Sequence, residues 1–288
     1  MAKKKQTSTY QRRRAKRKPT RRTPDFKTFI ASVVAAILIF TAWKLMAADE
    51  GQPIDDCTDL TAVTITDSDI DSDIYRYEGF TVSYNRNLHL PNYVVWELTA
   101  DETYGDVKRP SKFTVDPAVD GSATPDDYRN SGFDRGHMAP AADMKWSEEA
   151  MAASHYMTNI APQRHTLNAG SWSTLENNCR AWARRDSVIV IVCGPVLTDR
   201  LTETIGDSHV VVPERYFKVV LAPYARPPRG IGFVMPNGDV PGGVQTTAMS
   251  IDDVEAITGL DFFTNLPDSI EAAVESQNRY QIWQRKKR

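Results

Sequence analysis

The chain has 288 residues, which is enough for one large domain or two small ones. Hydrophobic residues make up 41% of it and charged residues 25%, as is ordinary for a globular protein. Its three cysteines, Cys57, Cys179 and Cys193, form no Cys-x-x-Cys pair, which argues against a structural zinc site. An exported domain would allow one disulfide with one thiol left over, and the sequence leaves the pairing open.

The net charge of −2 hides an uneven distribution. Residues 1–27 hold twelve of the 35 Lys and Arg but one of the 37 Asp and Glu, so this basic tail carries +11 and the remainder carries −13. Such a tail could bind nucleic acid or serve as a nuclear address. Because it directly precedes an apolar segment, we interpret it as a cytoplasmic tail that sets membrane topology and attracts anionic lipid.

The apolar segment, residues 28–48, predicts a transmembrane anchor. Its first sixteen residues carry no charge, and about 20 apolar residues suffice to span a bilayer. Trp43 and Lys44 suit the membrane interface, where a lysine can extend to the headgroups. A cleaved signal peptide and a buried helix are the alternatives.

The positive flank predicts a single-pass protein of a bacterial inner membrane, with the N-terminus in the cytoplasm and the following domain outside it. Secretion after signal cleavage is one alternative location. A mitochondrial location is the other, because the N-terminal arm is rich in Arg, contains Ser and Thr, and has almost no acids.

Residues 49–74 are predicted to be an exposed acidic linker, because residues 49–73 contain nine acidic groups and little apolar periodicity. Order is expected from Tyr75 onward. Two strands, 80–85 and 93–99, are expected on either side of a break at Pro91 and Asn92. A loop is expected over 116–133.

The second half of the chain mixes strand and helix signals without a regular alternation, which predicts an α+β fold. Ser250 and Asp253 resemble a helix N-terminal cap before an apolar run. Residues 271–288 are expected to form a helical or disordered C-terminal tail. The expected strands are 186–195, which a Gly-Pro turn ends, and 209–213, 216–221 and 230–235.

The chemistry is concentrated in three segments that follow one another. The first, Phe133–Met144, contains Asp134-Arg-Gly-His137; the second is Thr158–Gln163; the third is Leu167–Glu176, with Arg180 shortly after it. By itself, Asp-Arg-Gly-His could be a charged turn that Gly136 makes tight. Three such segments in this order are a much more specific signal.

Together the segments resemble the DNA/RNA non-specific endonuclease family, a group of ββα-metal nucleases that includes endonuclease G. The resemblance runs from about Tyr75 to Phe263 and does not cover the tail, the anchor or the linker. It implies a ββα-metal nuclease fold with a central antiparallel sheet flanked by helices, over residues 75–270. It also implies a metal-dependent endonuclease that cuts DNA and RNA without sequence preference, and leaves open a homodimer and an inhibitor protein as partners.

Phosphodiester hydrolysis needs an attacking water, a proton acceptor and positive charge near the phosphate. His137 can accept the proton, because neutral imidazole titrates near neutral pH. Asn168 offers a hard oxygen ligand for a hydrated Mg²⁺, with Mn²⁺ as a substitute. The resemblance implies the same two roles.

Helix geometry limits what Glu176 can do. If residues 172–185 are helical, Glu176 and Arg180 are neighbours on one face. Asn168 would lie about 12 Å from Glu176 along a straight helix axis, too far to share one ion. We therefore expect a bend near Asn168, with Glu176 holding metal-bound water. The resemblance implies that Arg135 and Arg180 contact phosphate and that Asn159 lies at the substrate.

Structural roles compete with these. Arg135 could pair with Asp134 or Glu176, and Glu176–Arg180 could be an ordinary helix ion pair compatible with catalysis. Asp134 is expected to brace its turn and Trp172 to pack in the core. The remaining histidines are assigned to the surface or to capping: His89, His155, His165 and His209.

The acidic charge of the body is unusual for a nucleic-acid binder. A groove needs only local positive charge, and an acidic remainder should weaken non-productive binding. Two other functions compete with the nuclease: a catalytically silent nucleic-acid-binding relative, and a phosphodiesterase for small phosphate esters. Candidate groove cations are Arg135, Arg164, Arg180, Arg184 and Arg185.

Overall fold

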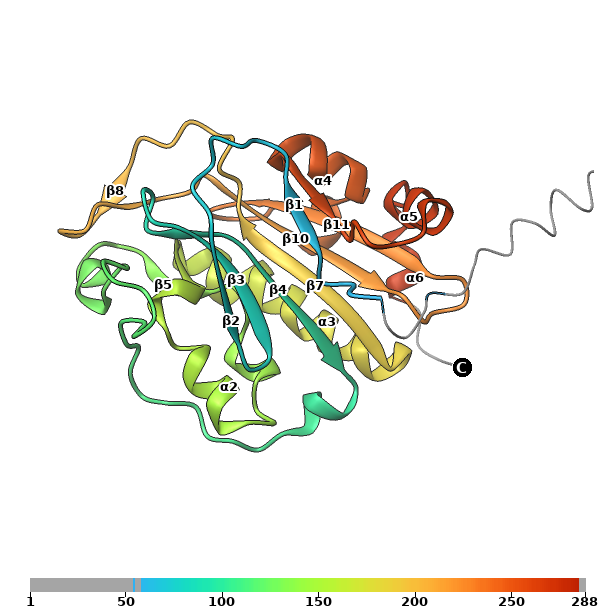
Figure 1. The fold of residues 1–288 in the computed structure, drawn as a ribbon, viewed down its shortest axis with the longest axis horizontal. Coiled ribbons are helices and arrows are strands. Elements are labelled where there is room, and N and C mark those ends of the chain that lie inside the picture. The colour runs from blue at the N-terminus through green and yellow to red at the C-terminus, as the bar shows by residue number, and fades with distance from the viewer. Residues whose placement is uncertain (1–53, 55–57, 285–288) are drawn as a thin grey trace, which may run out of the picture. The chain divides into compact units, whose positions relative to one another are not determined.

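The computed structural model describes residue 54 and residues 58–284, and in this part of the chain a seven-stranded antiparallel sheet forms the centre (Figure 1). Its strand order is β12-β11-β10-β7-β4-β3-β2. The strands are β2 (Asp73–Tyr77), β3 (Phe80–Asn85), β4 (Leu90–Thr99), β7 (Val188–Pro195), β10 (Arg215–Ala222), β11 (Arg229–Pro236) and β12 (Ala248–Met249).

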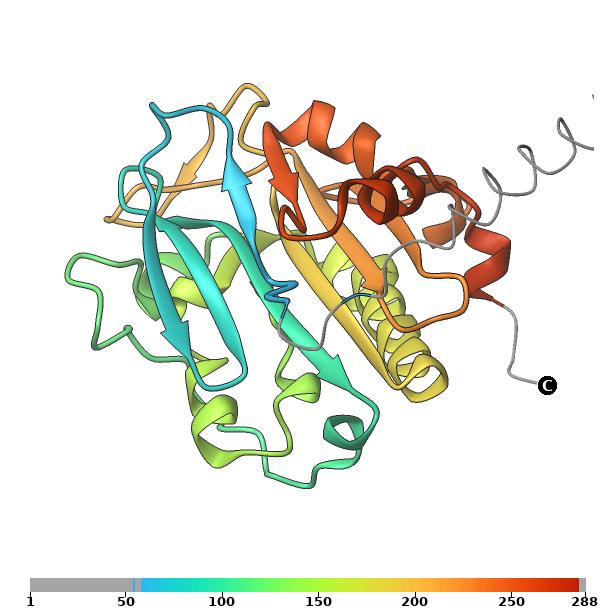
Figure 2. The same cartoon turned by 45° about the vertical axis from the view of Figure 1, so that its right-hand side comes forward.

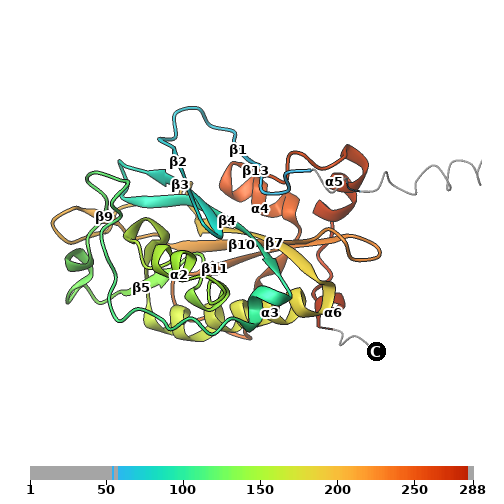
Figure 3. The same ribbon diagram turned by 60° about the horizontal axis from the view of Figure 1, so that its bottom comes forward.

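Helices cover both faces of this sheet. Figure 3 shows α2 and α3 on one side and α4 and α5 on the other. The helices are α2 (Glu148–Ala153), α3 (Ser173–Asp186), α4 (Ile251–Thr258), α5 (Asp268–Glu275) and α6 (Tyr280–Trp283). Three short pairs accompany them: β1 (Val63–Ile65) with β13 (Leu260–Phe262), β5 (Asp134–His137) with β6 (Ile160–Gln163), and β8 (Thr204–Ile205) with β9 (Val210–Val211).

The two faces of the sheet build two separate cores, because side chains alternate along a strand. In β7, Ile189 and Ile191 belong to the core that includes Trp182 of α3. Val190 and Val192 belong to the core under α4 and α5. This double burial explains the uninterrupted apolar run of the predicted strand at 186–195, which is confirmed within a residue or two at its start.

The strand and helix predictions are largely confirmed, except that the turn between β3 and β4 comes earlier in the chain than predicted. β3 matches residues 80–85, and β10 and β11 contain 216–221 and 230–235. The expected break at Pro91 and Asn92 is wrong: both lie inside β4, and the register shifts between Ser83 and Tyr84 of the partner strand. A bulge accommodates the proline, which cannot donate to the ladder. Of 209–213, only β9 is a strand.

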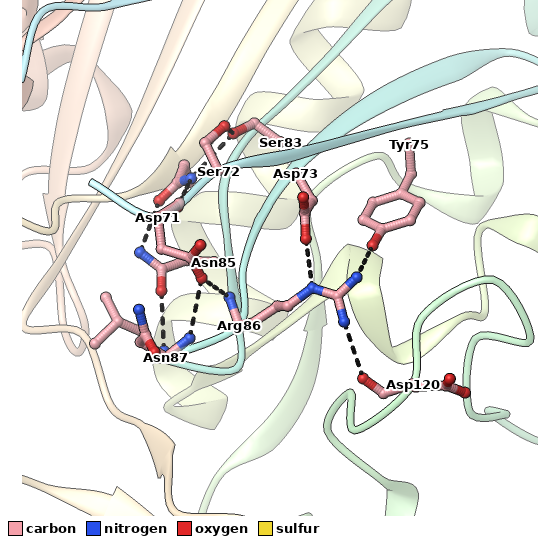
Figure 4. A network of polar contacts seen from close by, with 11 residues as sticks. Asp71, Ser72, Asp73, Tyr75, Ser83, Asn85, Arg86, Asn87 and Asp120 are labelled. Carbon is pink, nitrogen blue, oxygen red and sulfur yellow. Dashed lines mark hydrogen bonds and ion pairs between the residues drawn. The ribbon is translucent and has the colours of Figure 1, made fainter. Parts of the chain in front are cut away.

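The turn between β3 and β4 is held by polar contacts around Arg86 (Figure 4). Its side chain contacts the carboxylate of Asp73, donates to the hydroxyl of Tyr75 at 2.6 Å, and reaches the carbonyl of Asp120 at 3.4 Å. The Arg86 main-chain N–H donates to Asp71 at 2.8 Å. Asp71 and Asp73, which belong to the predicted linker, thus help to hold this turn.

Part of the predicted linker is therefore not free. β1 pairs antiparallel with β13, so residues from Val63 onward join the fold beside α4 (Figure 2). The helix predicted after Ser250 is confirmed: the Ser250 hydroxyl accepts from the Asp253 N–H at 3.1 Å. The C-terminal tail is helical in its described part, because α6 buries Trp283 against Trp182, with ring centroids 4.7 Å apart.

The predicted basic tail (1–27) and anchor (28–48) lie outside the described residues. Within the residues that are described, no helix combines the length and apolarity needed to cross a membrane. Cys179 and Cys193 are buried free thiols, so no disulfide joins these two.

Candidate active site

The strand pair β5–β6 carries the most specific motif. His137 pairs with Ile160, and Asp134 with Gln163, so the first and second motif segments lie side by side. Gly136 is part of the strand rather than of a turn. A Cβ at this position would stand 2.3 Å from Oε1 of the fully buried Gln163, so only glycine lets the two strands approach here.

His137 is buried, with 8% of its surface exposed. Its main-chain carbonyl accepts from Nε1 of Trp172 at 3.2 Å, and its ring lies 5.2 Å from that of Phe113. Its Nε2 has no hydrogen-bond partner among the described residues. Burial, and to a smaller extent Arg109 and His155, holds the imidazole pKa well below its usual value. The side chain is therefore a neutral proton acceptor at neutral pH.

The sequence predicts a surface or capping position for His155; it is not at the surface, although it does bond a carbonyl of α2. It is 2% exposed, and its ring meets that of His137 edge to face with centroids 5.1 Å apart. Arg109 Nε donates to His155 Nε2 at 3.2 Å. Nδ1 is therefore the protonated nitrogen, and it can donate to the Met151 carbonyl 3.1 Å away. No motif around His155 distinguishes it from the other histidines.

Asn168 lies in a short π-helical segment, η5 (Leu167–Trp172), that leads into α3. The expected bend is confirmed: Gly170 has φ −100° and ψ −109°, which interrupts the helical path. Asn168 Nδ2 donates to Asp134 Oδ2 at 2.9 Å. Asp134 also accepts from the exposed His165 at 2.8 Å, so it braces Asn168 and His165.

α3 carries both Glu176 and Arg180, as predicted, but they are not each other's ion-pair partners. Arg180 Nη1 lies 2.7 Å from Asp143 Oδ1, and Nη2 donates to the side-chain oxygen of Asn177 at 2.9 Å. Asp143 is 1% exposed and also accepts from Trp96 Nε1 at 3.2 Å. Sequence reasoning missed Asp143, although it lies within the first motif segment.

A buried lysine interacts electrostatically with Glu176 and Asp143. Lys218 of β10 is 1% exposed, and its Nζ is 4.3 Å from the ring centroid of Trp172 and 5.2 Å from that of Trp96. Burial lowers the Lys218 pKa, but Cys193, Glu176 and other neighbours more than offset it, so the amine stays charged. A lysine in the otherwise apolar run Tyr216–Leu221 was the sequence signal for this position.

The carboxyl of Glu176 has a pKa near neutral pH, which suits a group that exchanges protons or holds water. Burial raises the pKa of its carboxyl to about 7, Lys218 opposes that effect, and Asp143 adds to it. Near neutral pH the group is therefore close to half ionised. A carboxylate with such a pKa in a cluster of charges is a candidate functional group.

Arg135 and Asn159, two of the predicted substrate-contacting residues, lie in different surroundings. Arg135 donates from Nη2 to the Pro125 carbonyl at 2.6 Å and lies over the rings of Phe113 and Tyr128, at 5.6 and 5.8 Å. Asn159 is fully buried, and its side chain bonds Ala139 N–H, Ala139 C=O and Ser154 C=O at 2.8–2.9 Å. Asn159 thus holds the main chain at Ala139 and Ser154, and its expected contact with substrate stays a prediction.

The predicted groove cations are only partly available. Arg184 donates to Thr103 at 2.8 Å, and Arg185 bonds Asp186 and the carbonyl of Trp283, at the far end of α3. Arg164 is exposed and lies 5.0 Å above the ring of Phe133, in a hollow that Arg200 also lines. Of the five candidates, Arg135 and Arg164 therefore lie on or next to β5 and β6, and Arg180 lies on α3.

A central antiparallel sheet between helices, with the strand–strand–helix series β5, β6 and α3 at one face, defines a mixed α/β fold of the endonuclease G type. The solved structure of EndoG in complex with EndoGI matches it with a TM-score of 0.63 and 27% identity, over 67% of this chain and 86% of that one. The sequence model of the family described as DNA/RNA non-specific endonuclease matches residues 59–269. The chain therefore belongs to this family.

Curated relatives agree with this assignment. Mitochondrial nuclease EXOG of Mus musculus is 36% identical over 214 residues, 67% of this chain and 58% of the relative. Mitochondrial endonuclease G of Homo sapiens is 32% identical, over 66% of this chain and 69% of the relative. Nuclease C1 of Cunninghamella echinulata var. echinulata is 33% identical, over 67% of this chain and 84% of the relative. The chain thus spans about 58% of the length of the mouse relative.

Proposed function

We propose that this protein is a metal-dependent endonuclease that hydrolyses phosphodiester bonds in DNA and RNA without sequence preference. The observation that carries the proposal is His137: a buried, neutral imidazole whose Nε2 has no hydrogen-bond partner in the described structure. Buried polar atoms are normally paired, so an unpaired one beside Arg109 and His155 points to a functional role. Membership of the family supplies the reaction class.

His137 is the general base in this proposal. Its Nε2 takes the proton from the water that attacks phosphorus, and its low pKa keeps it unprotonated before the reaction. His155, held by Arg109 and Met151, fixes the ring from the side and cannot itself accept a proton from the water, because its Nε2 already accepts from Arg109.

Asn168 is the proposed protein ligand of Mg²⁺ or Mn²⁺. Its amide nitrogen is bonded to Asp134, which orients the side chain and leaves the amide oxygen without a recorded partner among the described residues. A neutral oxygen fits a hard, largely hydrated cation. Bound there, the cation would stabilise the charge that develops on the phosphate and the leaving oxygen.

Glu176 is proposed to hold ordered water, which requires its carboxylate form, and Arg135 and Arg180 to contact phosphate. Arg180 keeps one guanidinium edge on Asp143 and Asn177. Arg135 is fixed by Pro125 and by two aromatic rings, so its orientation is set before substrate arrives. Preorganised cations of this kind lower the barrier without reorganising during the reaction.

The deciding experiment measures nicking of circular plasmid DNA by the full chain, with Mg²⁺ or with EDTA. We expect metal-dependent nicking that His137→Ala reduces by at least about 100-fold, in the range of a lost general base. The control is His209→Asn, which alters a histidine outside the three motif segments at φ 55°, a conformation that asparagine tolerates. It should nick like the wild type.

Other outcomes would select the alternatives. A folded wild-type chain that binds DNA but never nicks it, with Mn²⁺ also tried, would be a silent binding relative. Cleavage of a dinucleotide or a simple phosphodiester at a higher kcat/KM than polymer would identify a small-ester phosphodiesterase. Parallel assays with RNA and DNA test the proposed lack of sugar preference.

The anchored location also stays a proposal, since residues 28–48 lie outside the described structure. The mouse and human relatives are named as mitochondrial, which agrees with the mitochondrial alternative. The solved EndoG structure contains EndoGI and concerns EndoG inhibition, which makes a protein inhibitor a reasonable partner to seek. A homodimer remains a proposal for ultracentrifugation to test.

A further inference from the structure

A second group of acids comes from α4 and α5. These two helices lie on the sheet face opposite α3 (Figure 3). Asp252, Glu255 and Glu275 each place one carboxylate oxygen so that the three oxygens lie within 4.8 Å of one another. Asp252 and Glu255 are three residues apart on α4, so they share one face of that helix. Glu275 is the last residue of α5.

The three side chains run from solvent into the protein. Asp252 is exposed, Glu255 is partly buried, and Glu275 is 7% exposed. The cluster therefore has one open end, through which a hydrated ion could enter. The Glu255 carboxylate is oriented by the main-chain N–H of Phe262, which donates to its Oε1 at 2.9 Å.

Glu275 supplies an independent sign that something is bound here. Its Oε1 is buried and has no hydrogen-bond partner in the described part of the chain, although its carboxylate belongs to the cluster. A buried carboxylate oxygen without a partner is costly, because burial removes its water without replacing it. A ligand with positive charge would remove that cost.

The surrounding sequence offers no cation of its own. Residues 230–278 contain no Lys or Arg, while 252–275 contain seven Asp and Glu. Burial first, and then the nearby acids, raise the pKa of Glu275 to about 8 and that of Glu255 to about 7. The charged neighbours that contribute are all acidic, Asp252, Asp261 and Glu271, and the Phe262 N–H opposes them at Glu255. The cluster is thus one of negative charge, which a cation would balance.

We propose that Asp252, Glu255 and Glu275 form a binding site for a hard divalent cation, with Ca²⁺ as the probe, that joins α4 to α5. Calcium binds carboxylate oxygens at about 2.3–2.6 Å, so two oxygens on one ion can be up to about 5 Å apart. The spacing of the three oxygens agrees with this limit. Water would complete the coordination from the exposed Asp252 side. The site is separate from Asn168 and does not rest on the proposed nuclease activity.

The test is isothermal titration of the full chain with CaCl₂, in an Asn168→Ala background that removes the proposed active-site ligand. We expect one Ca²⁺ per chain. Adding Glu275→Gln, which keeps the side-chain shape, should weaken binding at least tenfold. Asp252→Asn, at an exposed position, should weaken it at least threefold. Glu148→Gln, at an exposed position on α2 on the other face of the sheet, is the matched control and should bind within twofold.

Thermal unfolding gives a second readout. Saturating Ca²⁺ should raise the Tm of the Asn168→Ala chain but leave that of Asn168→Ala/Glu275→Gln unchanged, because only a ligand of the native state stabilises it. The proposal is overturned if no Ca²⁺ binds, or if binding is the same with and without Glu275→Gln. A Tm that responds to pH but never to Ca²⁺ would also overturn it, and would identify carboxyls that share protons instead.

Discussion

Asp134 accepts a hydrogen bond from the side-chain amide of Asn168 at 2.9 Å, so the strand that carries His137 also orients the residue proposed to bind the metal. The two residues are 34 positions apart, and only the packing of β5 against η5 brings them together. The proposed base and metal ligand therefore share one rigid support.

Asp134→Ala should raise the Mg²⁺ concentration needed for half-maximal nicking by about 10- to 100-fold, the usual effect of losing an outer partner of a metal ligand. The reason is that Asn168 loses the acceptor that fixes its amide. His165→Ala is the control, because it removes the other, exposed partner of Asp134 and leaves the Asn168 contact in place. Equal metal dependence in both variants would contradict this role of Asp134.

The pH–rate profile should follow Glu176 on its acid side. The pKa of Glu176 is raised to about 7 and that of His137 is held well below its usual value, so as pH falls Glu176 protonates first. Nicking should fall below about pH 7, and Glu176→Gln should lower the rate and flatten this limb. A limb that is unchanged in Glu176→Gln would assign it to another group.

Lys218→Met should destabilise the fold by about 1–3 kcal/mol, because Asp143 keeps Arg180 but Glu176 loses the cation that most opposes its burial. It should also move the acid limb of the rate profile to higher pH, since Lys218 lowers the pKa of Glu176. Urea unfolding measures the first effect. The exposed Lys112→Met is the control, for which a change within about 0.5 kcal/mol is expected.

Gly136→Ala should destabilise the chain by about 1–3 kcal/mol or more and reduce nicking, because its Cβ would meet the buried Gln163 side chain. Gly238→Ala is a matched control: a Cβ there meets nothing within 4 Å, and its φ is not in the left-handed region. A second-site Gln163→Ala should recover part of the loss. Similar stability of the two alanine variants would show that β5 and β6 can separate at no cost.

In buffer free of divalent cations, the Tm should fall as pH rises from about 5 to about 8. Glu275 and Glu255 have folded-state pKa values of about 8 and about 7, above their ordinary value, so the native state holds protons that the unfolded state releases. The stability from those protons is present at low pH and lost through this window. Glu275→Gln should reduce the slope more than Glu271→Gln does, and an equal slope would argue against the cluster.

Much of the fold followed from local patterns. The apolar run at 186–195 identified β7, and the Ser250–Asp253 pair identified the start of α4, because strand burial and helix capping depend on residues a few positions apart. The order of the motifs was sufficient to identify the family and to select His137, Asn168 and Glu176. The bend near Asn168 followed from helix geometry alone.

Tertiary structure decided which side chains meet. His155 beside His137, Asp143 beside Arg180, and Glu275 opposite Glu255 join positions from different elements, and no periodicity along the chain records such contacts. It also buried Asn159 completely, since burial depends on the whole packed domain. Chemistry-bearing residue types and local elements are properties of short segments, whereas burial, pairing and pKa depend on neighbours that only the folded sheet brings into contact.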